Sequence, residues 1–145
     1  MKITSKGRYA VLAMADIAQH GKKTPCNLSH VSIRQNISLP YLERILSDLK
    51  KSNLVKSQKG PGGGYRLSKE SDQIRILEIL NAIDEKIKTT GCGNNPKSYC
   101  SGVGKKCVAH GFWENLEDLI GNYLNSVSLS DLINDPLSID KLEMQ

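Results

Sequence analysis

Residues 37–51 read ISLPYLERILSDLKK, and they predict an amphipathic helix that begins just after Ser38. Pro40 is tolerated in the first helical turn, and the Ser38 hydroxyl can accept a hydrogen bond from the first-turn amides. Four aliphatic side chains follow at the i, i+3, i+4, i+7 spacing of one buried face: Leu42, Ile45, Leu46 and Leu49. The opposite face offers side chains that can meet solvent or a ligand: Tyr41, Glu43, Arg44, Ser47 and Lys51.

Two helices are predicted ahead of this segment. Residues 8–20 are rich in alanine and other good helix formers, and Gly21 ends them. Residues 28–36 are a short polar–apolar run that predicts a second helix, with Val31 and Ile33 as its buried positions. The amphipathic helix is therefore the second member of a helix pair.

A hairpin is predicted after the pair. Residues 54–58 and 65–68 have the character of short strands, and four glycines within residues 60–64 favour a tight turn between them. A phosphate-binding P-loop would need Lys-Ser/Thr and then a helix after its last glycine, whereas Tyr65 begins a strand. Helix, short helix, helix and hairpin is the order of a winged helix-turn-helix domain, which places its second helix in the major groove of DNA.

The C-terminal half contains two further apolar helical patterns. The first predicts a fourth helix with one buried face: Ile76, Ile79, Leu80 and Ile83. The second is a wide stripe that includes the chain's single Trp and single Phe: Phe112, Trp113, Leu116, Leu119, Ile120, Tyr123, Leu124 and Val127. Pairing two copies would bury this stripe and set two recognition helices about one DNA turn apart. The alternative is that the stripe packs on its own domain.

Charge is distributed unevenly along the 145 residues, whose net charge is +5. Residues 1–75 carry 14 Lys and Arg against 5 Asp and Glu, whereas residues 76–145 carry 6 against 10. A basic half predicts a polyanionic partner, and nucleic acid is the polyanion we expect. No window approaches a membrane span, and residues 1–7 lack the apolar core of a signal peptide. We expect a cytoplasmic protein with no membrane partner and no small-molecule substrate.

Three cysteines and a histidine form the chemical centre of the sequence. Cys92, Cys100, Cys107 and His110 are spaced C-x7-C-x6-C-x2-H within a polar, glycine-rich segment. Four such donors suit a tetrahedral metal or the two irons of a [2Fe–2S] cluster, and thiolates select zinc, copper(I) or iron–sulfur centres. Structural zinc sites usually close with C-x2–4-C knuckles, so the wider spacing favours the larger cluster. Cys26 stands apart and is predicted to be a small buried residue.

Three rival functions are compatible with these donors. A DNA-binding protein with a structural zinc would have the same fold and no colour. An electron carrier would leave the basic winged domain unexplained. A redox-active thiol enzyme is disfavoured because the chain contains no Cys-x-x-Cys pair. We expect a regulator and not an enzyme.

Four motifs carry a resemblance to a known family: TSKGRYA at 4–10, SLPYLE at 38–43, KGPGGGY at 59–65, and Cys107-x-x-His110. In this order they resemble the IscR-type iron–sulfur regulators, a bacterial family of winged-helix transcription factors, over roughly residues 2–131. The resemblance implies that a [2Fe–2S] cluster is ligated by four residues: Cys92, Cys100, Cys107 and His110. It also implies that a homodimer binds a palindromic double-stranded operator.

The resemblance assigns further residues. The expected DNA-binding residues are Ser38, Tyr41, Glu43, Arg44, Lys59 and Gly60. The expected dimerisation residues are Phe112, Trp113, Leu116, Leu119, Ile120, Tyr123 and Leu124. Arg44 should read guanine, and Lys6, Lys56 and Lys59 should neutralise phosphate. By resemblance, Glu43 discriminates against one class of operator until cluster loading moves it out of conflict.

The predicted fold is mainly α with a small β-hairpin wing. The predicted domains are a winged helix-turn-helix domain at 1–85 with its wing at 54–68, a cluster-binding loop at 86–111, a dimerisation helix region at 112–134, and a flexible tail at 135–145. The resemblance implies a regulator that senses its iron–sulfur cluster, represses cluster-assembly genes, and changes operator choice with cluster occupancy. An iron- or redox-responsive regulator of the same family is the alternative, together with the zinc protein above.

Overall fold

Helices dominate the computed structural model, which describes residues 2–91 and 105–134. The elements follow in this order: α1 (Ser5–His20), α2 (Leu28–Gln35), α3 (Leu39–Lys51), β1 (Val55–Gln58), β2 (Gly64–Leu67), the 3-10 turn η1 (Ser71–Gln73), α4 (Ile76–Ala82), α5 (His110–Ser126) and α6 (Leu129–Asn134). The predicted class, mainly helical with one small hairpin, is confirmed.

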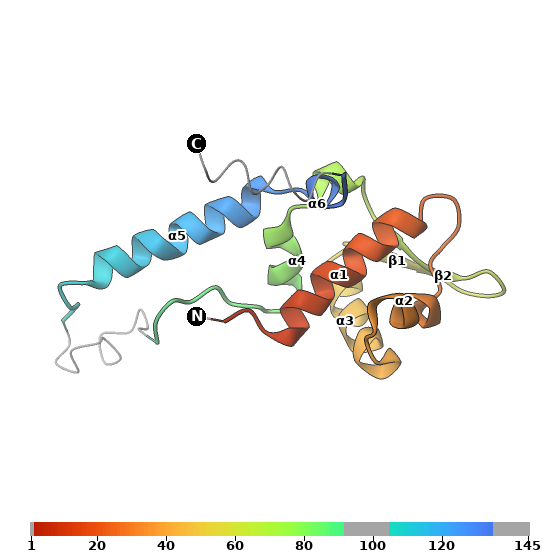
Figure 1. Ribbon diagram of the computed structural model, residues 1–145, viewed down its shortest axis with the longest axis horizontal. Helices are drawn as coiled ribbons and strands as arrows, with labels where there is room; N and C mark the ends of the chain where they lie inside the picture. The colour runs from red at the N-terminus through yellow and green to blue at the C-terminus, as the bar shows by residue number, and fades with distance from the viewer. Residues whose placement is uncertain (1, 92–104, 135–145) are drawn as a thin grey trace.

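Helix α1 is the central element, and α2, α3, α4, α6 and β2 all pack against it (Figure 1). Its buried face is made of small and medium side chains, with Ala10, Ala13 and Met14 fully buried. The helix begins three residues earlier than predicted because the Thr4 hydroxyl accepts a hydrogen bond from the Gly7 amide at 3.1 Å. Small residues on this face let several helices approach α1 closely.

Helix α2 is fixed by polar caps at both ends. The Asn27 side chain accepts a hydrogen bond from the Ser29 amide at 2.8 Å, and Asn36 ends the helix in the left-handed conformation. Val31 is fully buried as predicted, but Ile33 is 78% exposed, so the prediction that it is buried is wrong. Two residues along a helix turn a side chain by about 200°, and Ile33 therefore points away from the core.

Helix α3 carries the predicted buried face. Its four aliphatic side chains are fully excluded from solvent: Leu42, Ile45, Leu46 and Leu49. Ser38 occupies the N-cap position, but its hydroxyl makes no capping hydrogen bond, so that part of the prediction is wrong. The Ser38 carbonyl still accepts the Leu42 amide at 3.0 Å, and the helix begins through backbone bonding and the early proline.

The hairpin is antiparallel and has a third partner. Val55 pairs with Leu67, and Ser57 pairs with Tyr65. On the outer edge of β2, Cys26 and Tyr65 exchange two backbone hydrogen bonds of 2.8 Å each. The segment before α2 is thereby joined to the wing, so the wing cannot move independently of the helix pair.

Glycines are required at the tip of the hairpin. Gly60 and Gly62 have φ values of +96° and +73°, which side chains rarely adopt. A Cβ atom at Gly64 would lie 2.1 Å from the carbonyl oxygen of Cys26. The glycine run therefore shapes a tight tip and also allows β2 to pack closely against the Cys26 segment.

The C-terminal part leaves the body of the molecule and returns to it. Helix α5 packs on α4 and then projects to one side, as Figure 1 shows. The chain returns through a short bridge in which Ile76 donates to Val127 at 3.0 Å and Leu129 donates to Ile74 at 2.8 Å. Val127 and Leu129 are buried in the core, and α6, which the sequence patterns did not predict, packs on α1.

Two predictions concern what lies outside these elements. The predicted tail at 135–145 lies outside the described residues. In the part of the chain that the structure describes, no helix is long and apolar enough to cross a membrane.

Candidate functional site

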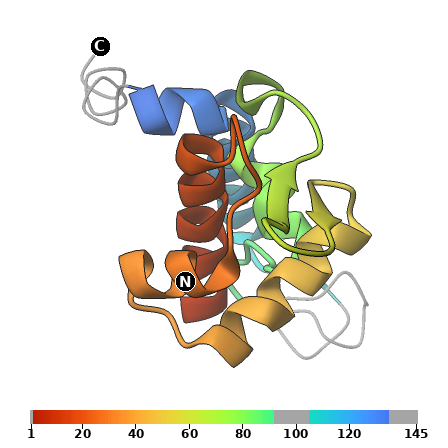
Figure 2. The same cartoon turned by 90° about the vertical axis from the view of Figure 1, so that its right-hand side faces the viewer.

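A shallow cleft lies where the starts of α2 and α3 meet the wing. It is lined by the following residues: Asn27, Leu28, Ser29, Leu39, Glu43, Gly63, Gly64 and Tyr65. Figure 2 shows α2, α3 and the hairpin grouped on this side of the molecule, opposite the side from which α5 projects. Two helix N-termini and a glycine-rich turn thus converge on one surface, and such backbone amides suit phosphate groups.

Most of the predicted DNA-binding side chains are accessible on this surface. Five of the six are exposed: Ser38, Glu43, Arg44, Lys59 and Gly60. Tyr41 is only half-buried and packs edge-on against Tyr9, with 5.8 Å between the ring centroids. Part of Tyr41 therefore serves the contact between α1 and α3, and the remainder faces the surface.

Lys6 makes contacts within the protein that the sequence did not predict. Its ammonium group lies 2.8 Å from an Asp48 carboxylate oxygen and also donates to the Ile83 carbonyl at 3.4 Å. Lys6 thereby holds α1 against α3 and the end of α4, and its expected phosphate contact stays a prediction. Lys56 and Lys59 are exposed, as the phosphate role requires.

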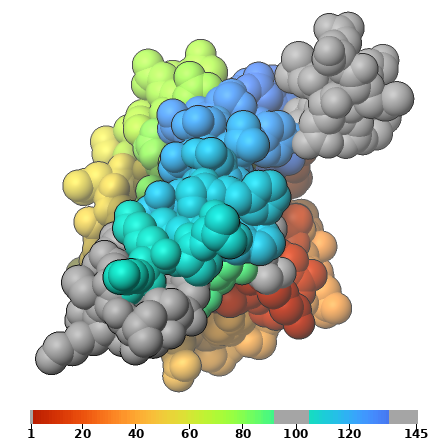
Figure 3. Space-filling view, turned by 90° about the vertical axis from the view of Figure 1, so that its left-hand side faces the viewer, coloured from red at the N-terminus to blue at the C-terminus, as the bar shows by residue number. Residues whose placement is uncertain are grey.

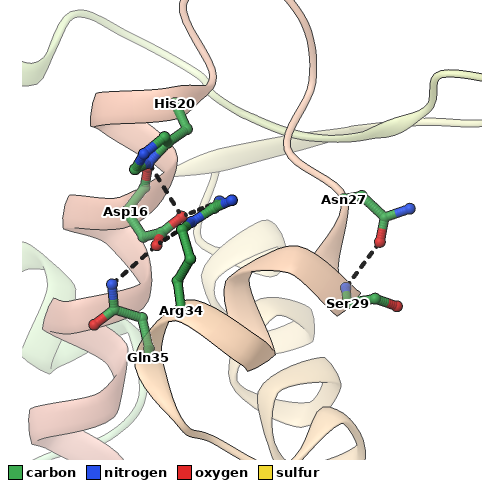
Figure 4. A network of polar contacts seen from close by, with 6 residues as sticks. All are labelled: Asp16, His20, Asn27, Ser29, Arg34 and Gln35. Carbon is green, nitrogen blue, oxygen red and sulfur yellow. Dashed lines mark hydrogen bonds and ion pairs between the residues drawn. The ribbon is translucent and has the colours of Figure 1, made fainter.

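A buried carboxylate fixes the helix pair to α1 (Figure 4). Asp16 is 1% exposed and accepts two hydrogen bonds from the Arg34 guanidinium, at 2.6 and 2.9 Å. It accepts a third from the Gln35 side-chain Nε2 at 2.9 Å. Burial alone would raise the pKa of Asp16, but the bonds from Arg34 and Gln35 outweigh it and hold the pKa below its ordinary value. Sequence reasoning missed this network because its members lie 18 and 19 residues apart, with no periodic relation.

Two of the four predicted metal ligands are brought together at the start of α5. Cys107 is half-buried, and His110 is the first residue of α5 and 8% exposed. The His110 amide donates to the Cys107 carbonyl at 3.1 Å, so both side chains belong to one turn. Cys92 and Cys100 lie outside the described residues. Within residues 2–91 and 105–134, three or more metal-binding side chains do not gather anywhere.

Glu114 completes the surroundings of His110. Its carboxylate lies 2.9 Å from His110 Nε2, one helical turn along α5. Metal-binding histidines usually have their second ring nitrogen held by a carboxylate in this way, which fixes the ring orientation. A thiolate and an imidazole in one turn, with a carboxylate behind the imidazole, suit zinc or an iron–sulfur cluster. The i, i+4 spacing of His110 and Glu114 was the sequence signal for this contact.

Cys26 lies elsewhere and has a different character. It is buried, as predicted, in the backbone bridge to Tyr65. Burial raises the pKa of the Cys26 thiol, and the nearby Asp16 carboxylate raises it further, although Arg34 opposes both. Cys26 lies beside β2, in a different part of the fold from Cys107 and His110, so the structure does not bring it into their donor set.

The chain leading from α4 toward the cysteine segment is held by two glutamates. Glu85 accepts hydrogen bonds from the Thr4 amide, at 3.2 Å, and from the Thr4 hydroxyl. Glu117, on α5, accepts from the Thr89 amide at 2.8 Å and from its hydroxyl at 3.1 Å. One glutamate thus ties this chain to the start of α1, and the other ties it to α5. Neither role has a signal in the local sequence pattern.

Helix α5 presents the predicted apolar stripe at the surface. Figure 3 shows α5 from the side on which it projects. Phe112 and Leu119 are 64% and 67% exposed, and Trp113 and Tyr123 are also exposed. Three other members are half-buried, Leu116, Ile120 and Leu124, and Val127 at the end of the stripe is buried in the core. Among the described residues, its own domain therefore covers the end of the stripe and leaves Phe112, Trp113, Leu119 and Tyr123 exposed.

Comparison with known proteins places these features in context. The family model Rrf2, described as an iron-dependent transcriptional regulator, matches residues 3–135. The HTH-type transcriptional regulator IscR of Cronobacter sakazakii is 43% identical over 145 residues, which cover all of this chain and 88% of that protein. The corresponding regulator of Escherichia coli is 44% identical over 140 residues, covering 97% of this chain and 85% of that protein.

Two solved structures are similar. T. potens IscR has a TM-score of 0.76 and 31% identity, covering 95% of this chain and 90% of that chain. CymR, the global cysteine regulator of B. subtilis, has a TM-score of 0.78 and 28% identity, covering 92% of this chain and 97% of that chain. The helix pair, the wing and the projecting helix thus recur in related transcriptional regulators.

Proposed function

The chain belongs to the Rrf2 family of iron-dependent transcriptional regulators, and from this we propose that it senses a [2Fe–2S] cluster held by Cys92, Cys100, Cys107 and His110. It is a DNA-binding regulator and not an enzyme. The relatives named IscR support iron–sulfur regulation, and the proposal adds the cluster type and its ligands.

The turn that contains Cys107 and His110 carries the proposal. His110 is almost fully buried, and the Glu114 carboxylate holds its Nε2 at 2.9 Å. Glu114 thereby fixes the orientation of the imidazole at the start of α5. When bound, an iron–sulfur cluster supplies a link between the cysteine segment and α5 that depends on iron and redox conditions.

The two glutamate contacts support a route from this site to the DNA-binding surface. Glu117 on α5 accepts a hydrogen bond from the Thr89 amide, and Glu85 accepts one from the Thr4 amide, just before the start of α1. Cluster binding by the cysteine segment would stiffen this route and shift the relative populations of different positions of α3 and the wing. Cluster occupancy would then alter operator choice, with Glu43 as the residue that excludes one class of operator.

The DNA-binding surface is proposed to consist of α3 and the wing. Exposed Arg44 suits guanine recognition, and Lys59 beside Gly60 suits phosphate or the minor groove. Ser38, Tyr41 and Glu43 complete the set. The exposed stripe on α5 supports a homodimer that binds a palindromic operator, with residues 1–85, 86–111 and 112–134 as DNA-binding, cluster-binding and dimerisation regions.

The test is anaerobic purification followed by visible absorption and by counts of iron, sulfide and zinc. We expect two irons and two sulfides per protomer, with the visible spectrum of a [2Fe–2S] centre. One zinc and a colourless solution would refute the cluster and support the zinc protein. Cys107→Ala and His110→Ala should lose the colour, whereas the matched control Cys26→Ala should keep it, because Cys26 is buried in a separate part of the fold.

A further inference from the structure

The outer face of the hairpin carries a pair of like charges. Lys56 and Arg66 stand directly opposite each other in the register of β1 and β2, and both are exposed. Their neighbours along each strand, Val55 and Leu67, point to the opposite face, toward the core. Like charges directly opposite each other on one sheet face are destabilising, so this pair costs stability in the isolated protein.

Two more cations lie next to this pair. The Arg66 guanidinium donates to the Lys23 carbonyl at 3.1 Å, which holds the loop between α1 and α2 beside β2. Lys22 and Lys23 in that loop are both exposed. Figure 2 shows the loop beside the hairpin, on the same side of the molecule as α2 and α3. We call the four residues Lys22, Lys23, Lys56 and Arg66 the outer wing cluster.

The outer wing cluster lacks compensating acidic groups. In the part of the chain that the structure describes, none of its four members forms an ion pair with a carboxylate; the nearby Lys69 does, with Glu78 at 2.8 Å. Glu70 is the one acidic residue in the hollow that Lys22 and Arg66 also line. Four exposed cations that form no ion pair with a carboxylate suit a polyanion better than a protein partner.

We propose that the outer wing cluster binds the phosphate backbone of duplex DNA flanking the operator. This inference rests on DNA binding by α3 and the wing tip, and it extends the contact beyond them. Lys56 and Arg66 lie behind the tip that holds Lys59, on the two strands of the hairpin, and Lys22 and Lys23 lie in the loop held beside β2. A duplex held by α3 and the tip would continue past this face. Its contribution would be electrostatic and independent of base sequence.

The test uses the full-length protein as purified under anaerobic conditions. An operator is first selected from a random duplex pool by the wild-type protein, and it is then prepared as a short duplex and with about ten flanking base pairs on each side. Binding is measured by fluorescence anisotropy at several salt concentrations. If the wild-type protein selects no duplex, DNA binding itself has failed, which is distinguishable from failure of the flank contact.

The decisive variant is Lys56→Gln/Arg66→Gln. We expect roughly tenfold weaker binding to the long duplex at 0.1 M salt, and a salt slope lowered by about two per protomer. Binding to the short duplex should weaken by a clearly smaller factor, because Lys56 is also expected to neutralise phosphate within the operator whereas Arg66 is not. The single variant Lys56→Gln should raise the urea midpoint slightly or leave it unchanged, because it removes a repulsion and no hydrogen bond among those described.

The matched control is Lys2→Gln/Lys86→Gln, which removes two exposed charges far from the hairpin. It should weaken both duplexes equally and only slightly. Equal losses on the short and long duplexes in the Lys56/Arg66 variant would overturn the proposal in favour of contact within the operator. No loss on either would show a solvated surface, and a loss no larger than that of the control would show a general charge effect; both also overturn it.

Discussion

Replacing Asp16 with asparagine should destabilise the protein more than any other single removal of charge. The buried carboxylate accepts three hydrogen bonds, two of them from the Arg34 guanidinium (Figure 4). An asparagine keeps one acceptor oxygen and turns an NH2 group toward the guanidinium, so the bidentate pairing is lost. Breaking a buried ion pair costs about 3–5 kcal/mol. Because Arg34 is about a third exposed and can regain water, we expect the lower end, about 3 kcal/mol.

The assay is urea denaturation followed by circular dichroism, at pH 7 and at lower pH. For a chain of this size a loss of about 3 kcal/mol corresponds to a fall in Tm of about 10 °C. The folded pKa of Asp16 is lowered, so its contribution is complete above the unfolded pKa and is lost as pH falls through the folded pKa. The difference between wild type and Asp16→Asn should therefore shrink below about pH 4.

Asp48→Asn is the matched control, because it removes a partly exposed ion pair with Lys6. It should cost less than about 1 kcal/mol. The double variant Asp16→Asn/Arg34→Ala should cost less than the sum of the single variants, because the residues interact directly. A loss below about 1 kcal/mol for Asp16→Asn at pH 7, or a loss that persists unchanged to pH 3, would refute the reasoning.

Further outcomes are expected at four residues: Glu117, Glu114, Glu43 and Leu119. Glu117→Gln should speed hydrogen exchange of the Thr89 amide about fivefold, because a charge-assisted hydrogen bond becomes a neutral one. The hydrogen bond from the Thr89 backbone amide lowers the pKa of Glu117. In the wild type, protection of the Thr89 amide from exchange should therefore persist at neutral pH and fall in acid, as the pH passes through the folded pKa of Glu117. Protection that does not change with pH would contradict this. Glu114→Ala should lose its cluster to a chelator at least tenfold faster than wild type, followed by visible absorption, and equal rates would remove Glu114 from the site. Glu43→Ala should broaden the set of operators bound by the cluster-free protein, measured by sequencing selected duplexes, and an unchanged set would exclude Glu43 from discrimination. By analytical ultracentrifugation at micromolar concentration, the wild type should sediment as a dimer and Leu119→Glu as a monomer. A monomeric wild type would refute the dimer proposal.

The sequence was most informative where structure depends on neighbouring residues. The buried face of α3 follows from four aliphatic side chains at helical spacing. The hairpin tip follows from its glycines, because the tight turn has positive φ values that other residues rarely adopt. The Cys107–His110 pair could be identified for the same reason, since its spacing matches a single turn. Local periodicity and local chemistry carry such features directly.

Other features depend on packing between distant segments and have no local signal. Arg34 is an ordinary surface-type residue until α2 packs on α1 and brings it to Asp16. Lys6 likewise pairs with Asp48, which lies on another helix, 42 residues away in the sequence. In both cases the partner lies more than a dozen residues away. Ile33 differs, because its own position on α2, about 200° from Val31, turns it outward.

The return of the chain after α5 has a consequence for how this protein can be divided. Val127 and Leu129 fill the core beneath α1, and their backbone bonds to Ile74 and Ile76 close the bridge described above. A truncated fragment ending at residue 85 would lack both side chains and would expose to solvent the apolar surface of α1 that α6 covers. The core around α1 is therefore completed by residues that follow the proposed cluster-binding segment in the sequence, and a nascent chain can complete this core only after that segment has been synthesised.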